Sequence, residues 1–443
     1  MAFAGAYRWT AVPLCAGVAL LLAIARPSVG RGPGWLLDWS LLACLFAVAV
    51  QLIPLPASTR ERLSPQGFAV DRIVALGAEP AIHPPHPLSV DAESTAWALA
   101  IGAAYVGLFW CARAIFSSGG VRSTVRGVAS LGLALTALVA VQRATSPALL
   151  YWYWRPMSVG ASPYGPFVNR NDLASWLAMA VPLVIGYAMA RHRSQQRSDG
   201  GAMPGISIDP TQLWLGGAAV LMTGGLLASM SRAGILGGAI GLLAFVAFSR
   251  KRIGGGGGVG WMIAGLAAMV ALASAYANLG TLAMRLQETT EQGTWGRPAI
   301  WRDTWRMASD FWLTGVGAGA FQRGMLAYQE GSRLFFFNHA HDEYLQLFAE
   351  GGLVVAVPAT IAAIAAVVLM ARHVGADRTA MFWVRAGAIS GLIAVAVQSV
   401  WDTGLRMPAN GILFAVIAAI ALHEPRPASR SAGTRERTRT PTS

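Results

Sequence analysis

Long apolar runs recur along almost the whole of this chain, and they restrict it to very few folds. A helix needs about 20 apolar residues to cross a bilayer. Only helices and closed barrels satisfy their backbone hydrogen bonds in lipid, and the short alternating strands typical of a barrel are absent from the sequence. The sequence therefore predicts an all-α, polytopic membrane helical bundle of about 10–12 transmembrane helices. The candidate spans are residues 9–25, 34–53, 96–116, 127–141, 172–190, 213–229, 233–248, 261–278, 345–370, 381–401 and 409–422.

Composition supports the same fold class. Of the 443 residues, 55% are hydrophobic and only 12% are charged, whereas soluble domains carry about 25% charged residues. The net charge of +13 would suggest a nucleic-acid partner in a soluble protein. Here the basic residues stand in loops between the apolar runs, where membrane topology explains them. We therefore expect the lipid bilayer as a partner and no nucleic acid.

Basic residues cluster on alternate loops, as expected when all of these loops face the cytoplasm. The clusters lie within residues 113–126, 191–197, 250–252, 372–378 and 426–439. The loops expected to face the periplasm are then those near 54–93, 142–171, 230–232, 279–344 and 402–408. Eleven spans with a cytoplasmic tail place Met1 outside the cytoplasm, unless one span near the start is misassigned.

The chain divides into three regions. Residues 1–160 hold the first transmembrane helices and no functional motif. Residues 161–423 hold the polar clusters described below, together with the long loop 279–344, which predicts a helical insertion on the periplasmic side. Residues 424–443 are rich in Arg, Pro, Ser and Thr, and this composition predicts a disordered cytoplasmic tail.

Three polar clusters stand where helices are expected to start on the periplasmic side. They span residues 167–172, 231–232 and 338–342. Asn, Ser and Asp are common N-caps, so a purely structural interpretation is open for each cluster. A helix N-terminus also carries free N–H groups and partial positive charge. Three such starts on one face would therefore suit an anionic group such as a diphosphate.

Arg232 and Arg170 are the basic residues of the first two of these helix starts. Arg232 is either a snorkelling arginine at a helix end or a guanidinium fork that binds phosphate oxygens. Arg170, between Asn169 and Asn171, is either part of a capping scaffold or a contact to the donor substrate. Both interpretations stay open on the sequence alone.

The long loop carries Trp301 and Trp305 interleaved with Arg297 and Arg302. This pattern predicts one or two amphipathic helices lying on the membrane, with the tryptophans packed as anchors. Arg297 and Arg302 are candidates for binding phosphate, although a nearby aspartate is an alternative partner for either. The glycine-rich segment 315–319 allows close backbone approach.

His341 is the strongest candidate for a catalytic residue. On a helix beginning near Asn338, His341 falls on one stripe and Glu350 falls on another, with Glu343 and Gln346. Histidine changes its protonation state nearest to neutral pH, which suits it to take a proton from a sugar hydroxyl.

A metal site is the competing interpretation of this segment, because His339 and His341 with the neighbouring acids could bind zinc or manganese. No further histidine follows at regular ligand spacing. The cysteines give no zinc pattern either, since Cys15, Cys44 and Cys111 all lie within apolar runs. We therefore expect no metal and no other cofactor.

Four blocks of the sequence resemble the O-antigen ligase and O-antigen polymerase superfamily, and they keep the family's order from about residue 160 to 423. The blocks are residues 165–171, Ser231 and Arg232 with Gly234, the loop 297–321, and residues 339–352. The segment 401–410 also resembles the family's penultimate loop. Asp342 replaces the Asn, Ser or Gln that usually follows the histidine, and Val355 stands where the family often has glycine.

The resemblance implies a glycosyltransferase of the bacterial inner membrane, with its active site facing the periplasm. It implies metal-independent transfer of a glycan from a polyprenyl-diphosphate carrier, such as undecaprenyl diphosphate, to a glycan, lipid A core or protein acceptor. Surface lipopolysaccharide or exopolysaccharide would be the product. His341 becomes the base, and Arg232, Arg297 and Arg302 become diphosphate ligands. Further contacts to the donor or glycan are expected from Arg170, Asn169, Asn171, His339 and Glu350.

A lipid-linked glycan flippase or transporter is the alternative from another functional class. A transporter is expected to place polar residues at the mid-depth of several spans. Here the predicted spans are nearly uncharged and polar residues gather at one face. The pattern therefore favours the enzyme.

Overall fold

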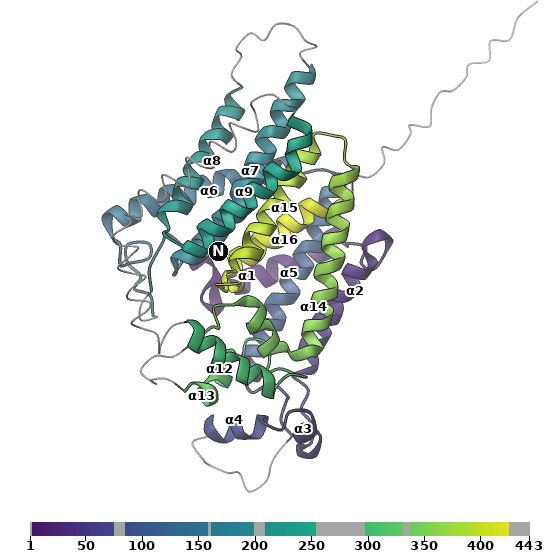
Figure 1. The fold of residues 1–443 in the computed structure, drawn as a ribbon, viewed down its shortest axis with the longest axis vertical. Helices are drawn as coiled ribbons and strands as arrows, with labels where there is room; N and C mark the ends of the chain where they lie inside the picture. The colour runs from purple at the N-terminus through teal and green to yellow at the C-terminus, as the bar shows by residue number, and fades with distance from the viewer. Residues whose placement is uncertain are drawn as a thin grey trace, which may run out of the picture.

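The computed structural model is a bundle of helices (Figure 1). The residues that it describes are 2–74, 85–157, 161–198, 209–253, 297–330 and 337–424. Within these ranges every regular element is a helix, apart from three isolated β-bridges. Nine helices of the described ranges are long and apolar enough to cross a membrane. The predicted all-α membrane bundle is thus confirmed.

The nine helices follow the predicted spans closely. They are α1 (Arg8–Ala25), α2 (Trp35–Val50), α5 (Ala92–Ser118), α6 (Val121–Thr145), α7 (Arg170–Ser198), α8 (Pro210–Ala228), α9 (Arg232–Ile253), α14 (Glu343–Ala376) and α15 (Met381–Gln398). Of the two remaining predicted spans, the last one, 409–422, is the shorter apolar helix α16 (Pro408–Leu422). The other, at 261–278, lies outside the described residues, as does the tail from residue 425.

The remaining elements are short and lie between the long helices. They are η1 (Ala2–Gly5), η2 (Gly32–Gly34), α3 (Ala57–Leu63), α4 (Gly67–Val74), α12 (Arg297–Asp310), α13 (Phe321–Tyr328) and η3 (Gly404–Arg406). One or two helices were predicted for the long loop, and its described part contains α12, which carries the Trp and Arg pattern, and α13. In α12 the buried residues Ile300, Thr304 and Met307 recur at helical spacing, which gives this helix one apolar face.

Helices α7 and α15 form the protein-enclosed core of the bundle. In their most apolar stretches 83% and 78% of the residues are buried, against 17–39% in the other spans. The α15 backbone comes very close to its neighbours: a Cβ atom on Gly391 would lie 2.3 Å from the Met179 carbonyl oxygen of α7. Small residues allow such close approach between membrane helices. The other spans surround this pair and keep more of their surface for lipid.

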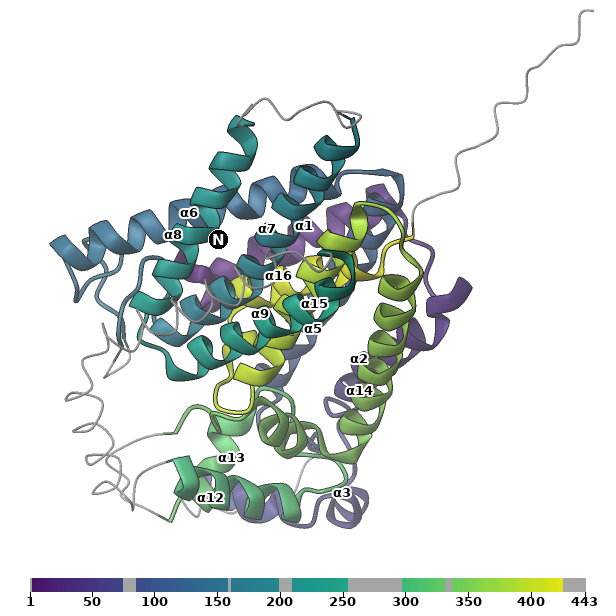
Figure 2. The ribbon, with the colours of Figure 1, turned by 45° about the horizontal axis from the view of Figure 1, so that its top comes forward.

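One end of the bundle, here called the loop face, carries α3, α4, α12 and α13 (Figures 1 and 2). Two loops that are far apart in the sequence meet there, since the Val90 N–H donates to the Val316 carbonyl at 3.0 Å. The N-terminal segment lies on the same face, because Trp154 Nε1 donates to the Tyr7 hydroxyl at 3.0 Å. Helix α1 therefore starts on the loop face.

The opposite end, here called the basic face, carries the arginine-rich loops. Arg113 of α5 pairs with Asp38 of α2 at 2.8 Å. Arg252 at the end of α9 donates to the Asp377 carbonyl, between α14 and α15, at 2.6 Å. The structure thus gathers the predicted basic loops on one face and the predicted polar loops on the other.

The contact at Gly391 gives a direct test of the core. Replacing Gly391 with alanine forces a methyl group against the α7 backbone, and overpacking of this kind costs about 1–3 kcal/mol. The matched control is Gly224→Ala on α8, where a Cβ atom meets nothing within 4 Å and where alanine favours the helix. Thermal unfolding in detergent should show a lower melting temperature for Gly391→Ala only; equal melting temperatures would contradict the packing described.

Candidate functional site

The segment that carries His341 ends immediately before α14. Asp342 is the N-cap of this helix, and its Oδ1 accepts hydrogen bonds from the Tyr344 and Leu345 N–H groups, each at 3.0 Å. His341 adopts a φ of 55°, which few residues other than glycine adopt. The predicted helix start near Asn338 was therefore wrong, because the Asp342 cap starts the helix later. His341 stands in the turn before the helix rather than on a helical stripe.

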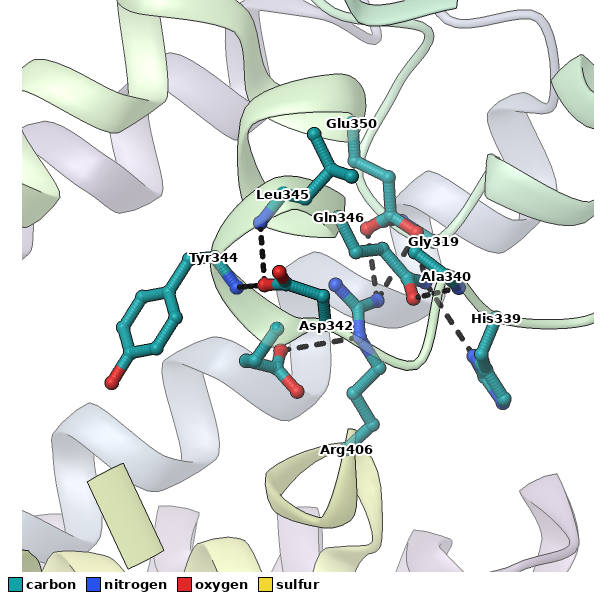
Figure 3. A network of polar contacts seen from close by, with 10 residues as sticks. Gly319, His339, Ala340, Asp342, Tyr344, Leu345, Gln346, Glu350 and Arg406 are labelled. Atoms are coloured by element: carbon teal, nitrogen blue, oxygen red, sulfur yellow. Dashed lines mark hydrogen bonds and ion pairs between the residues drawn. The ribbon is translucent and has the colours of Figure 1, made fainter. Parts of the chain in front are cut away.

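The predicted stripe of Glu343, Gln346 and Glu350 on α14 is confirmed. Its two carboxylates bind Arg406, which lies more than 50 residues later in the sequence. Gln346 Nε2 donates to Glu350 Oε1 at 2.9 Å. Arg406, in η3, donates to both Glu350 oxygens at 3.1 and 2.9 Å and lies 3.2 Å from Glu343 Oε1 (Figure 3). Burial alone would lower the pKa of Arg406, but the carboxylates of Glu350 and Glu343 outweigh it and raise the pKa. Arg406 thus stays charged and ties η3 to the start of α14.

Glu350 is also the point where the glycine-rich loop meets α14. Its Oε2 accepts the Gly319 N–H at 2.9 Å, and its carbonyl accepts Gln51 Nε2 and the Gly317 N–H, each at 3.0 Å. Gly315 has a φ of 67°, and a Cβ atom there would lie 2.1 Å from the Glu350 carbonyl oxygen. The predicted close backbone approach is confirmed. Because Glu350 is 4% exposed and both its carboxylate oxygens have partners, it holds the loop in place.

His341 faces a carboxylate across a short gap. Its Nδ1 lies 3.9 Å from Asp402 Oδ1, in the connection between α15 and α16. Neither His341 Nδ1 nor Asp402 Oδ2 has a hydrogen-bond partner in the described part of the chain. The histidine side chain is 37% exposed, whereas that of the aspartate is 5% exposed. A half-exposed imidazole beside a buried carboxylate can accept a proton and have the resulting charge stabilised.

His339 has a different environment from His341. Burial, together with the nearby Arg406 charge, lowers the pKa of His339 to about 4, so its imidazole is neutral near pH 7. Its Nδ1 lies 3.5 Å from Gln346 Nε2. The residue between the two histidines, Ala340, donates its N–H to Gln346 Oε1 at 2.9 Å and accepts Trp301 Nε1 at 3.0 Å. Trp301 therefore packs α12 onto the histidine segment.

The start of α7 lies beside the end of α15. Asn169 Oδ1 accepts the Asn171 N–H at 3.0 Å, which is an N-terminal cap. The Asn171 carbonyl accepts Gln398 Nε2 at 3.2 Å, and Asn410 Nδ2 donates to the Asp172 carbonyl at 3.0 Å. These contacts place the first polar cluster next to the connection that carries Asp402. They give the Asn169 side chain a capping role, whereas Asn171 takes part through its backbone.

Three of the arginines predicted to bind the donor substrate lie at helix starts on the loop face. Arg232 is the exposed first residue of α9, and its helix begins against α7, since a Cβ atom on Gly234 would lie 2.5 Å from the Ala174 Cβ. Arg297 is the exposed first residue of α12, and Arg170 is the half-exposed first residue of α7. None of these three arginines has an ion-pair partner among the described residues.

Arg302, unlike the other three arginines, lies near a carboxylate, and the candidate metal ligands face different partners. Arg302 is exposed, and its Nε lies 3.7 Å from Asp303 Oδ1, which is the alternative pairing considered from the sequence. His339 and His341 face different partners, Gln346 and Asp402. Over the described ranges, no group of three or more His, Cys, Asp or Glu side chains is arranged to hold a metal ion.

Asp402 and Arg406 are the two charged residues of the site that sequence reasoning did not select. Both stand in the short connection between two apolar runs, and ionisable residues so close to a membrane are costly unless they have a function or a partner. His341 was selected as an ionisable residue at a membrane boundary, and the same criterion would have selected Asp402 and Arg406. Their partners, Glu343, Glu350 and His341, are more than 50 residues away in the sequence, so only the fold reveals the pairing.

Truncating Arg406 tests whether this arginine supports the site. Arg406→Ala leaves the carboxylates of Glu343 and Glu350 buried without a counter-charge, which is expected to cost about 3–5 kcal/mol. Thermal unfolding should show this loss, whereas Arg323→Ala, at an exposed arginine of α13, should change stability by less than about 0.5 kcal/mol. Combining Arg406→Met with Glu343→Gln and Glu350→Gln should recover most of the stability. A triple variant as unstable as Arg406→Ala would contradict the ion-pair account.

The pKa of His339 predicts how stability depends on pH. The unfolded chain protonates this residue near pH 6.5, whereas the folded protein protonates it only near pH 4. The folded state therefore binds fewer protons in this window, and acidification from pH 6.5 to 4 should lower the free energy of unfolding by up to about 3 kcal/mol. In His339→Gln this part of the loss should disappear. Identical pH profiles for the variant and the wild type would contradict the lowered pKa of the His339 imidazole.

Comparison with protein families gives a match to part of the chain. Residues 217–360 match the family model described as O-antigen ligase. The matched segment contains α9 with Arg232, α12 with Arg297 and Arg302, and the turn with His341. No curated protein matches the chain. This segment is thus similar to the O-antigen ligase family, which supports the superfamily resemblance noted in the sequence.

Proposed function

We propose that the protein transfers a glycan from a polyprenyl-diphosphate carrier to an acceptor hydroxyl at the periplasmic face of the bacterial inner membrane. The observation that carries this proposal is the position of His341. It is a half-exposed histidine facing the buried Asp402, on the face where α7, α9 and α14 begin. The O-antigen ligase family match supports transfer chemistry of this general type.

The donor diphosphate would bind between the helix starts and the unpaired arginines. Helix N-termini attract anions through their free N–H groups and partial positive charge. Arg232 and Arg297 add full charges that no described carboxylate neutralises, and a guanidinium can bind phosphate oxygens through two parallel hydrogen bonds. Arg170 is placed to add a third charge. Arg302, which lies near Asp303, would contribute less.

His341 would act as the general base. The acceptor hydroxyl gives its proton to His341 Nε2 while its oxygen forms a bond to the anomeric carbon of the donor sugar. The bond between that carbon and the diphosphate oxygen breaks, so the configuration inverts and the lipid diphosphate leaves. Asp402, opposite Nδ1, stabilises the imidazolium, and the arginines stabilise the charge on the leaving diphosphate.

The remaining predicted residues would shape the site. His339 is neutral and half-buried, so it can offer a hydrogen bond to a sugar hydroxyl without adding charge. Glu350 would act through Arg406 and the glycine-rich loop, because its oxygens already have protein partners. Asn169 and Asn171 would hold the start of α7.

The positions of the basic residues indicate on which side of the membrane each face of the protein would lie. The positive-inside rule assigns the basic face to the cytoplasm, so the loop face with His341 would face the periplasm. Lipid-linked glycans presented on that side already store the energy for transfer in the sugar–diphosphate bond. No nucleotide sugar would then be needed.

Turnover in proteoliposomes tests the proposal. Purified protein is given a labelled polyprenyl-diphosphate oligosaccharide and candidate acceptors, with EDTA present throughout. Transfer by the wild type should fall by about a hundredfold or more in His341→Ala, because general base catalysis contributes that much. Arg232→Ala should lose about tenfold or more, since it removes a charged hydrogen-bond donor to phosphate.

Two control variants separate these effects from a general loss of surface charge. His86 is an exposed histidine near Asp71 on the loop face, and Arg323 is an exposed arginine of α13. His86→Ala and Arg323→Ala should keep near-normal transfer. If labelled lipid crosses the bilayer without transfer to any acceptor, the protein is a flippase and the catalytic role of His341 is refuted.

A further inference from the structure

The basic face contains a pocket that the glycan-transfer chemistry does not use. It has a volume of about 330 Å³ and lies where α7 and α9 end and where the chain turns into α15. Three arginines line it: Arg193 of α7, Arg252 of α9, and Arg378 of the turn before α15. It is therefore built from three separate parts of the chain, at the end of the bundle opposite to His341.

Two of these arginines are held in place by aromatic rings. The guanidinium carbon of Arg252 lies 3.7 Å from the ring centroid of Phe382, and that of Arg193 lies 5.8 Å from the ring centroid of Trp383. Cation–π contacts orient a guanidinium without neutralising its charge. The third arginine, Arg378, is exposed. The pocket thus presents oriented positive charge.

No carboxylate lines the pocket in the part of the chain that the structure describes. The nearby Asp377 is engaged elsewhere: its Oδ1 accepts the N–H and hydroxyl of Thr379 at 2.8 and 2.7 Å. Its Oδ2 lies 3.5 Å from Arg385 Nε. The lining residue Thr379 also stands just before α15, so the positive end of that helix adds to the potential. The pocket therefore suits an anion.

The position of the pocket relative to the membrane indicates which kind of anion it would bind. Its arginines stand at the ends of apolar spans, at the level where a bilayer has its headgroups. Basic pockets between membrane helices on the cytoplasmic side suit the phosphates of anionic lipids.

We propose that this pocket binds the phosphate of an anionic phospholipid headgroup, on the face of the protein opposite to the His341 site. The guanidinium groups of Arg193, Arg252 and Arg378 bind its oxygens. The proposal is independent of glycan transfer, because it rests on a separate set of residues.

Native mass spectrometry of the full-length protein in detergent micelles tests the proposal. The protein is titrated with dioctanoyl phosphatidylglycerol or, for comparison, with zwitterionic dioctanoyl phosphatidylcholine. The wild type should bind phosphatidylglycerol about tenfold more tightly, which corresponds to one or two charged hydrogen bonds to phosphate. The double variant Arg252→Gln/Arg378→Gln should lose this preference.

The matched control is Arg250→Gln/Arg372→Gln. It removes the same charge from exposed arginines of the same face that do not line the pocket, and it should keep the preference. Arg378→Gln alone, at an exposed side chain, should weaken binding without a change in melting temperature, which keeps the test valid if the double variant unfolds.

Three results would overturn the proposal. They are equal affinity of the wild type for both lipids, equal loss of affinity in the pocket and control variants, and displacement of the lipid by an equal concentration of inorganic phosphate or glycerol 3-phosphate. The last result would identify a site for a soluble phosphate compound instead.

Discussion

The ion pair between Arg406 and Glu350 is the interaction on which the candidate site depends. It joins η3, near the end of the described chain, to the first turns of α14. Glu350 also receives the Gly319 N–H and, on its carbonyl, Gln51 at the end of α2. A buried carboxylate such as that of Glu350 is costly unless a counter-charge satisfies it, and the partly buried Arg406 supplies that charge. Four distant segments therefore hold a common position at the loop face.

The same ion pair also helps to position the turn that carries His341. The connection that brings Arg406 to α14 also carries Asp402, which it sets opposite His341. Its other end is held where the Glu343 N–H donates to the Ser399 carbonyl at 2.9 Å. With Asp342 capping the helix and Arg406 holding the next turn, His341 is left half-exposed in a turn whose φ of 55° is sustained by its surroundings. The result is a fixed imidazole at an open surface, as a general base requires.

Hydropathy and arginine placement predicted the spans and the two faces, because lipid forces every span to be a long apolar helix. The site was only partly predictable. The 3.6-residue period found the stripe of Glu343, Gln346 and Glu350, but it could not show that Asp342 stops the helix short of His341. Residue spacing also could not pair Arg406 or Asp402 with partners on another helix. Glu350 was predicted to contact glycan, and its burial became visible only in the fold.

A structure of the protein in nanodiscs with a non-transferable phosphonate analogue of the lipid-linked donor tests the central claim most directly. The account predicts that the phosphorus groups contact Arg232 on the loop face. It also predicts that the anomeric carbon lies about 6 Å from His341 Nε2, which leaves room for one acceptor hydroxyl between them. An analogue bound on the basic face, or with its sugar turned away from His341, would contradict the assignment of His341 as the base.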